Sequence, residues 1–161
     1  MWHSPQHTPP DSAIDLFHGY TYSGHPVAAA VALKNLEIME NERLPERVRK
    51  ETGPYFAERL ATLMTNPIVG EVRSRGLMVA IDFADPARRD RPLARELVAS
   101  LNTRALDKGY IAMAKDSVLR LAPPLCISAG EVDELAQLVG ETVRDLQDEV
   151  TRSTRGTVAV A

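Results

Sequence analysis

The sequence predicts an α+β fold, a small domain in which helices lie on one side of a short sheet. Two observations predict it. Two helical segments within residues 25–65 are followed by the order β-β-α-β-β-α over residues 66–150. Of the 161 residues, 44% are apolar, which is enough to form a buried core. Residues 1–24 are predicted to be a loop, and residues 151–161 a flexible tail.

The first helix is expected to begin near His25. Pro26 suits the first helical position, because its missing N–H would have no partner there. Strong helix formers with small side chains, many of them alanine, fill residues 27–33 and continue to about Glu42. So many alanines predict a helix that packs closely against other protein.

A second helical segment is predicted over residues 45–64, with a kink or interruption at Gly53-Pro54 because proline cannot donate a backbone hydrogen bond. Two short strands should follow, over residues 68–72 and 77–83, joined by a turn at 73–76. The second strand is apolar enough to be central in the sheet. Asp85-Pro86 ends it.

The remaining elements are a helix, two strands and a last helix. The helix is expected over residues 92–108 and stops at Gly109. Strands are expected at 110–113 and 118–121, with a turn at 115–117. Ser128 and Glu131 have the spacing of a capping box, in which each side chain accepts from an exposed backbone N–H. The helix after them keeps one apolar face to Val150.

Composition excludes several classes of function. The net charge is −3 and the basic residues are scattered, so no surface for nucleic acid is expected. The longest apolar run, residues 27–33, is far shorter than the ~20 residues of a membrane span. His3 and His7 lie in a proline-rich stretch and should be exposed rather than bind metal. The single cysteine, Cys126, is expected to be buried and inert, and a soluble cytoplasmic protein is the simplest interpretation.

Two stretches of the sequence are more specific for one protein family than the order of helices and strands. Residues 17–26 read Phe-His-Gly-Tyr-Thr-Tyr-Ser-Gly-His-Pro, and residues 119–125 read Leu-Arg-Leu-Ala-Pro-Pro-Leu. Both resemble signature segments of the class III (ω-) aminotransferases, pyridoxal-phosphate (PLP) enzymes of fold type I. Arg75-Gly76-Leu77 resembles the strand pair that opens the small domain of that family. The resemblance extends from about residue 10 to residue 150.

The resemblance assigns each predicted segment to a part of a fold-type I enzyme. It implies that residues 66–150 are the small C-terminal domain of a fold-type I enzyme and that residues 25–65 are connecting helices. Residues 1–24 would be a loop remnant of the large PLP-binding domain. We therefore expect a C-terminal fragment of an enzyme that transfers an amino group between an amine or ω-amino acid and a keto acid, and that is a homodimer.

The first motif suits a phosphate. Gly19 and Gly24 let the backbone approach an anion closely, and Thr21 and Ser23 offer hydroxyl groups before a helix N-terminus. From the residues alone, capping of the helix by Thr21 or Ser23 is an alternative. The resemblance implies that Thr21 binds the PLP phosphate of the neighbouring subunit, with Ser23 and Tyr20 beside it. Aromatic packing is the alternative role of Tyr20.

The second motif places Arg120 in an apolar segment before a rigid Pro-Pro pair. A guanidinium group there can bind a carboxylate through two hydrogen bonds, which suits amino-acid and keto-acid substrates. The resemblance implies that Arg120 binds a substrate carboxylate. A structural salt bridge is the alternative.

No catalytic residue is expected in this chain. The family's lysine that forms a Schiff base with PLP lies N-terminal to the Gly-Tyr-Thr motif. The lysines present, Lys34, Lys50, Lys108 and Lys115, are each expected to be solvated. The chain alone should therefore be inactive. Two alternatives remain: an interaction module that completes the PLP-phosphate site of a full-length aminotransferase subunit, and, from fold analogy only, a small regulatory ligand-binding domain.

Overall fold

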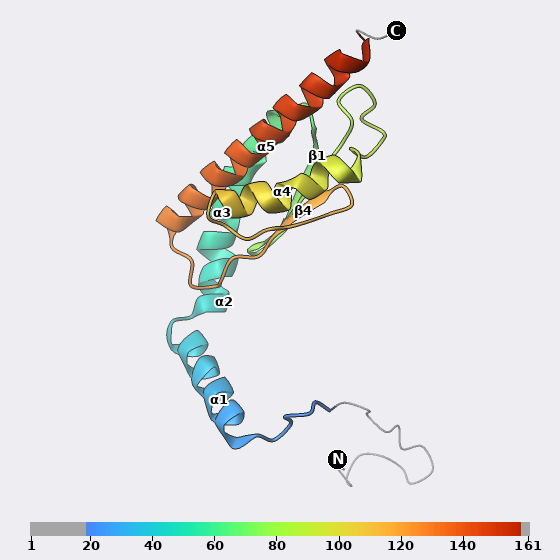
Figure 1. The fold of residues 1–161 in the computed structure, drawn as a ribbon. Coiled ribbons are helices and arrows are strands. Elements are labelled where there is room, and N and C mark those ends of the chain that lie inside the picture. Colours follow the sequence, from blue (N-terminus) through green and yellow to red (C-terminus); the bar gives the residue numbers. More distant parts are fainter. Residues whose placement is uncertain (1–18, 159–161) are drawn as a thin grey trace, which may run out of the picture. The chain divides into compact units, whose positions relative to one another are not determined.

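The computed structural model describes residues 19–158, with side chains as far as Ser153. The chain divides between Asn41 and Glu42 into two compact units, which are described separately (Figure 1).

The first unit contains a turn and helix α1 (Pro26–Asn41). The helix begins at Pro26, as the sequence predicted. None of its residues is buried. Its large apolar side chains are exposed, among them Val27, Val31, Leu33 and Leu36.

The second unit opens with a nearly continuous helical run, consisting of α2 (Leu44–Arg47), the π-helical turn η1 (Val48–Thr52), α3 (Gly53–Ala61) and the 3-10 turn η2 (Thr62–Thr65). The predicted interruption lies at Gly53-Pro54, where the wide π turn gives way to α3. Glycine is required at 53, because a Cβ atom there would lie 2.5 Å from the Val48 carbonyl oxygen and 3.1 Å from Gly76 Cα. The strand hairpin thus packs directly on this helix.

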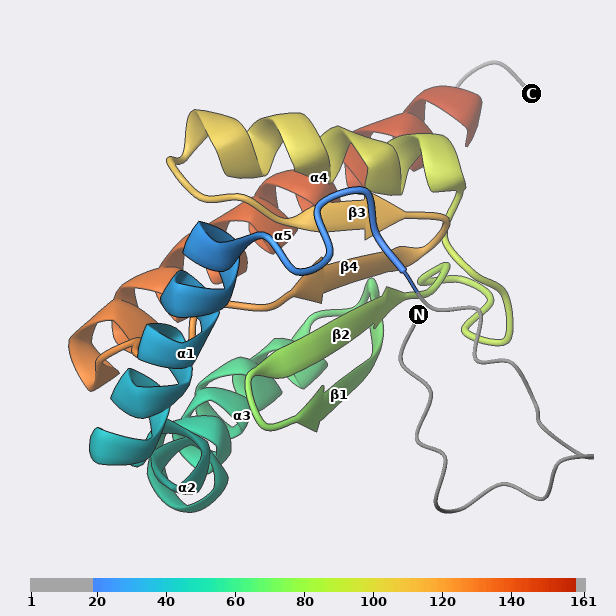
Figure 2. The ribbon, with the colours of Figure 1, turned by 90° about the horizontal axis from the view of Figure 1, so that it is seen from below.

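The sheet has four strands in the order β1-β2-β4-β3, with every neighbouring pair antiparallel (Figure 2). The strands are β1 (Val69–Arg75), β2 (Met78–Phe83), β3 (Met113–Lys115) and β4 (Val118–Leu121). Strand β2 is central, as predicted. Gly76 has φ +58° in the β1–β2 turn, a conformation that glycine adopts without strain.

Two elements begin later than the sequence predicted. Helix α4 (Arg95–Asp107) starts beyond Pro92, because the Leu93 N–H donates to the Phe83 carbonyl and holds that segment beside the sheet. Strand β3 starts at Met113 rather than at Tyr110. Tyr110 is buried instead, and its hydroxyl donates to Thr142 Oγ1 at 2.9 Å.

Helix α5 (Ala129–Val158) begins with the predicted capping box and is longer than predicted. Residues 151–158, expected to be a flexible tail, continue the helix. Helix propagation adds a hydrogen bond with each residue and does not need an apolar face. Local contacts such as Thr151 Oγ1 to the Gln147 carbonyl, 2.9 Å, also lie in this part.

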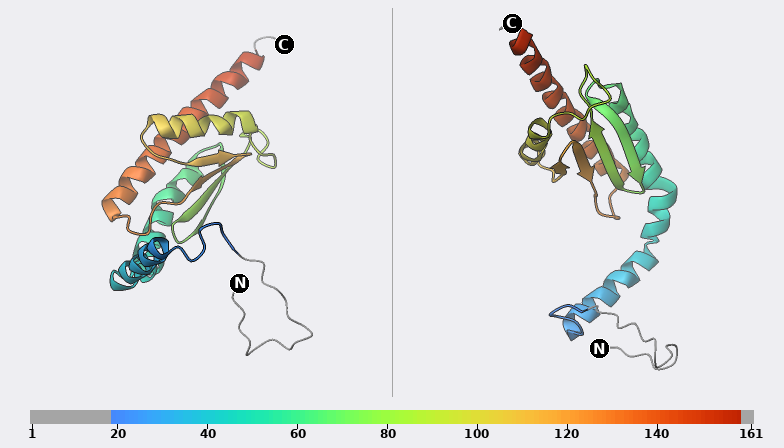
Figure 3. Two further views of the ribbon diagram at one scale, coloured as in Figure 1. Left: turned by 60° about the horizontal axis from the view of Figure 1, so that its bottom comes forward. Right: turned by 90° about the vertical axis from the view of Figure 1, so that its right-hand side faces the viewer.

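Helices α3, α4 and α5 lie against one face of the sheet, as predicted (Figure 3). The core between them includes Phe56 and Leu60 from α3, which are fully buried. Residues 44–65, predicted as connecting helices, therefore form part of this core. The predicted burial of Cys126 is wrong: its side chain is exposed in the loop after β4, and the neighbouring Ile127 is buried in its place.

Candidate functional site

The turn before α1 is held by its own polar groups. The backbone N–H of Tyr20 donates to Ser23 Oγ at 2.8 Å, and the Ser23 N–H donates to the Tyr20 carbonyl at 2.9 Å. Gly24 has φ +78°, and nothing lies within 4 Å of a Cβ atom placed on it. These bonds define a short, open loop that leads into a helix.

The sequence left open whether Thr21 or Ser23 caps α1. The structure gives that role to His25, because the Ala28 N–H donates to His25 Nδ1 at 3.4 Å and the Ala29 N–H donates to the His25 carbonyl. Ser23 instead bonds within the turn. Sequence reasoning missed this cap, since histidine is not a preferred N-cap residue.

The donors of this turn fit a phosphate group. Thr21 is exposed, and its hydroxyl makes no hydrogen bond with another described residue. The side chains of Tyr20 and Tyr22 are 74% and 78% exposed. A hydroxyl and backbone N–H groups before a helix N-terminus are the groups that bind phosphate in proteins. The described residues of this turn have the donor types that an anion such as a phosphate group needs.

Arg120 lies on the face of the sheet that the helices leave open. Strand partners directly opposite one another share a face, so Arg120 shares it with Ala80 and Met113 in the neighbouring strands. We call this surface the open face. Its members are Glu71, Arg73, Arg75, Met78, Ala80, Asp82, Met113, Lys115, Val118 and Arg120.

The cations of the open face differ in their partners. Arg73 pairs with Asp82 at 2.5 Å and with Glu71 at 3.4 Å, so its charge is neutralised across the β1–β2 pair. Arg75, Lys115 and Arg120 form no ion pair with any described residue. The structural salt bridge considered for Arg120 is therefore not formed within the part of the chain that the structure describes.

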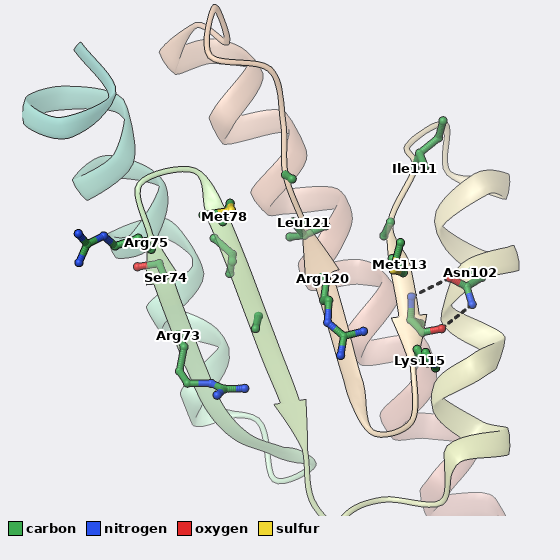
Figure 4. A pocket seen from close by; sticks show the side chains of 15 residues that line it. Arg73, Ser74, Arg75, Met78, Asn102, Ile111, Met113, Lys115, Arg120 and Leu121 are labelled. Carbon is green, nitrogen blue, oxygen red and sulfur yellow. Dashed lines mark hydrogen bonds between the residues drawn. The ribbon is translucent and has the colours of Figure 1, made fainter. Parts of the chain in front are cut away.

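A cavity of about 960 Å³ lies over this face, and Arg120 lines it together with the exposed side chains of Met78, Met113 and Ile111 (Figure 4). An arginine on an open, partly apolar surface can bind the carboxylate of an organic acid while the apolar side chains contact its carbon chain.

Asn102 of α4 fixes the edge of this cavity. Its Nδ2 donates to the Ala114 carbonyl at 2.9 Å, and its Oδ1 accepts from the Ala114 N–H at 2.8 Å. The side chain thus takes the place of a further strand along the outer edge of β3. No signal in the sequence distinguishes Asn102 from the other polar residues of α4.

Arg47 of α2 fixes the loop that follows Arg120. Its Nη2 donates to the carbonyls of Leu125 and Ile127 at 3.2 and 3.1 Å. The Pro123-Pro124 segment lies just before these carbonyls, so the rigid dipeptide and Arg47 together set the backbone path after β4. Sequence reasoning missed this contact because the partners are about 80 residues apart.

The four lysines of the chain are all in exposed or ion-paired settings. Lys34 pairs with Glu37 at 2.7 Å, Lys50 with Glu46 at 2.5 Å, and Lys108 with Asp145 at 3.1 Å. Lys115 is exposed on β3. None has the enclosed setting in which a lysine forms a Schiff base with a cofactor.

The described residues contain neither a metal-binding cluster nor a membrane-spanning helix. No group of three or more histidine, cysteine or acidic side chains is arranged to hold a metal ion. His3 and His7 lie outside the described residues. Within the same part of the chain, no helix combines the length and the apolar character of a membrane span.

Comparison with known proteins gives one consistent result. A family model described as "Aminotransferase class-III" matches residues 4–143. The chain is 43% identical over 141 residues to the aminotransferase y4uB of Sinorhizobium fredii, which covers 84% of this chain and 30% of that protein. It is 37% identical over 125 residues to the putrescine–pyruvate aminotransferase of Pseudomonas aeruginosa, covering 77% of this chain and 27% of the relative.

A solved structure agrees. The PLP-bound amine transaminase of an uncultivated Pseudomonas species superimposes with a TM-score of 0.67 at 32% identity, over 84% of this chain and 30% of the other. The chain thus spans about 30% of the length of the relatives that it matches.

Proposed function

The chain belongs to the class III aminotransferase family, whose members depend on PLP, and we propose that it is the C-terminal segment of such an enzyme. The whole enzyme would transfer an amino group between an amine or ω-amino acid and a keto acid. We place it in the cytoplasm, since a single cysteine provides no disulfide within the chain.

The observation that carries this proposal is Arg120 in the open-face cavity. Its guanidinium group is exposed beside apolar side chains and has no acidic partner among the described residues. We propose that it binds the carboxylate of the amino-acid or keto-acid substrate through two parallel hydrogen bonds. Such a contact orients the substrate and makes the site selective for acids.

At the other motif, Thr21 would donate its hydroxyl to the phosphate of PLP bound in a neighbouring subunit, with Ser23 and Tyr20 shaping the turn. The bond from the Tyr20 N–H to Ser23 Oγ supports this, because it holds the turn open while leaving the Thr21 hydroxyl available. PLP, when bound, supplies the electron sink for amino transfer. The residues of this chain anchor its phosphate end.

The 161 residues by themselves should not transaminate, because none of the four lysines has an enclosed setting. Incubation with PLP, reduction with borohydride and peptide mapping test this. We expect no stoichiometric adduct on any lysine and no turnover. A single stoichiometrically labelled lysine together with turnover would contradict the proposal.

A homodimer follows from the role given to Thr21. Helix α1 supports it, because Val27, Val31 and Leu33 are 64%, 64% and 68% exposed, which is costly for a free monomer. We expect the chain to self-associate in sedimentation velocity at micromolar concentration. A single species of monomer mass over the whole concentration range would argue against it.

A chimeric enzyme tests the proposed activity directly. Residues 19–158 would replace the matching segment of the Pseudomonas aeruginosa relative, and PLP content and amino transfer would be measured. Arg120→Gln should raise KM for the carboxylate substrate, and Thr21→Val should lower PLP retention. A folded, PLP-containing chimera in which neither variant has an effect would refute both assignments.

A second candidate is an interaction module that completes the phosphate site of a separate full-length subunit. The exposure of Thr21 and its turn favours it, since the donors are accessible to another protein. Mixing the chain with the Pseudomonas aeruginosa enzyme carrying the matching threonine-to-valine change would restore PLP retention in that case. If PLP retention is not restored, the second candidate is refuted and only the first remains.

A further inference from the structure

Two cations of the open face lie close together. Arg120 on β4 stands opposite Met113 on β3, and Lys115 is two residues beyond Met113 on the same face. Arg120 and Lys115 are therefore diagonal neighbours on adjacent antiparallel strands, a position in which Cβ atoms are about 7–8 Å apart or slightly closer. Long side chains at such positions can reach a common ligand.

The other cations of the face do not join this pair. Arg73 is bonded to Asp82, the acid that shares a row of the sheet with Lys115. Arg75 extends away from Arg120, whereas Arg120 leans along β4 toward the β3–β4 turn, next to which Lys115 ends β3 (Figure 4). Both Lys115 and Arg120 line the cavity. The cavity thus contains two neighbouring positive charges that no described acidic side chain neutralises.

Two unpaired like charges repel each other, so an anion that contacts both is stabilised twice. We propose that Lys115 is a specificity-determining residue that binds the second carboxylate of a dicarboxylate, while Arg120 binds the first. The proposal rests on the role given to Arg120 above. The spacer between the carboxylates would lie along β3 and β4, beside Met113, which stands opposite Arg120 and is 61% exposed. The substrate class of this site is therefore a short aliphatic dicarboxylic acid.

The test uses the 161-residue chain and two acids that differ in one charge, glutarate and butyrate. Titration at low ionic strength, followed by ¹H–¹⁵N correlation spectra and the Arg120 Nε–H signal, gives both dissociation constants. An exposed ion pair is worth about 0.2–1 kcal/mol, so glutarate should bind about 1.4- to 5-fold more tightly than butyrate. Raising the salt concentration should reduce this preference.

Variants separate the two roles. Lys115→Gln should make the two affinities equal, Lys115→Arg should keep the preference for glutarate, and Arg120→Gln should abolish binding of both acids. Lys50→Gln is the control, because Lys50 is a similarly exposed lysine outside the cavity. All three positions are exposed, so unchanged thermal melts are expected for the four variants.

The outcomes are distinguishable. Equal binding of the two acids by the unmodified chain would overturn the role of Lys115 and leave that of Arg120 intact, as would a preference that survives Lys115→Gln. If neither glutarate nor butyrate shifts the Arg120 signal, the proposed carboxylate site itself is refuted. Inorganic phosphate that binds more tightly than glutarate, with the same dependence on Lys115 and Arg120, would replace the dicarboxylate by a phosphate group.

Discussion

The two faces of the sheet are built from the same four strands and have opposite characters. On the covered face, Val79, Ile81, Leu119 and Leu121 are each at most 3% exposed and pack against the helices. On the open face, the alternate positions carry arginine, lysine, acidic residues and methionine. Because side chains alternate along a strand, successive residues belong in turn to the core and to the candidate site, and a register shift of one residue would exchange them.

The difference shows that stability and ligand binding are carried by separate residues of one element. In β4, Leu119 and Leu121 anchor the strand in the core, and Arg120 between them is free to face solvent. A change on one face should therefore affect unfolding, and a change on the other should affect binding.

The largest effect should come from opening a cavity under the covered face. Leu119 is fully buried, so Leu119→Ala should lower the free energy of unfolding by about 3 kcal/mol. The matched change on the open face, Met113→Ala, removes a side chain that is 61% exposed and should alter it by at most about 0.5 kcal/mol. Urea denaturation followed by circular dichroism measures both. Equal losses would mean that the open face is also part of the stabilising core.

An intermediate effect is expected in the loop that leads from β4 to α5. Arg47 holds the loop between Arg120 and α5 through the carbonyls of Leu125 and Ile127. Hydrogen bonds from a charged donor are worth about 1.5–3 kcal/mol. Arg47 Nε is buried without a partner among the described residues, and its removal offsets part of this loss.

Arg47→Met should therefore lower the free energy of unfolding by about 1–2 kcal/mol. The control is Arg49→Met, since Arg49 is exposed on the same helical run and should contribute little. If the two variants unfold at the same urea concentration, Arg47 does not hold the loop.

Much of the fold could be predicted from local patterns. Short apolar runs separated by turns identified both hairpins, the apolar character of residues 77–83 identified the central position of β2, and the spacing of Ser128 and Glu131 identified the start of α5. Predictions failed where a long-range contact overrides a local preference. Leu93 is held by the Phe83 carbonyl and delays α4, and the loop after β4 exposes Cys126 although its neighbours are apolar.

The candidate site was predictable only as separate residues. The resemblance to the family's signature segments singled out Thr21 and Arg120, whereas the residues alone left helix capping and a salt bridge as alternatives. The contacts that shape their surroundings were not. Asn102 clamps β3 from α4, and Lys115 becomes a neighbour of Arg120 only through the register of the β3–β4 pair. Register and long-range side-chain bonds depend on the packed structure.

The smallest expected effect is a pH-dependent loss of stability on the covered face, at the capping box of α5. The pKa of Glu131 is lowered, first by the hydrogen bond from the Ser128 backbone N–H and then by the Ser128 hydroxyl. A carboxyl group with a lowered pKa in the folded state stabilises the fold above its unfolded pKa, near the ordinary value of 4.5, and this contribution is lost as the pH falls through the folded pKa. Glu131→Gln should therefore lower the urea midpoint at pH 7, and the gap to the unmodified chain should close toward pH 3. Glu134→Gln, an exposed position in the same helix, is the control. The same variants also test whether the two faces are independent.

Because the capping box belongs to α5 on the covered face, glutarate binding at pH 7 should be the same in both variants. A Glu131→Gln variant that loses glutarate affinity while still folded would show that the two faces are coupled.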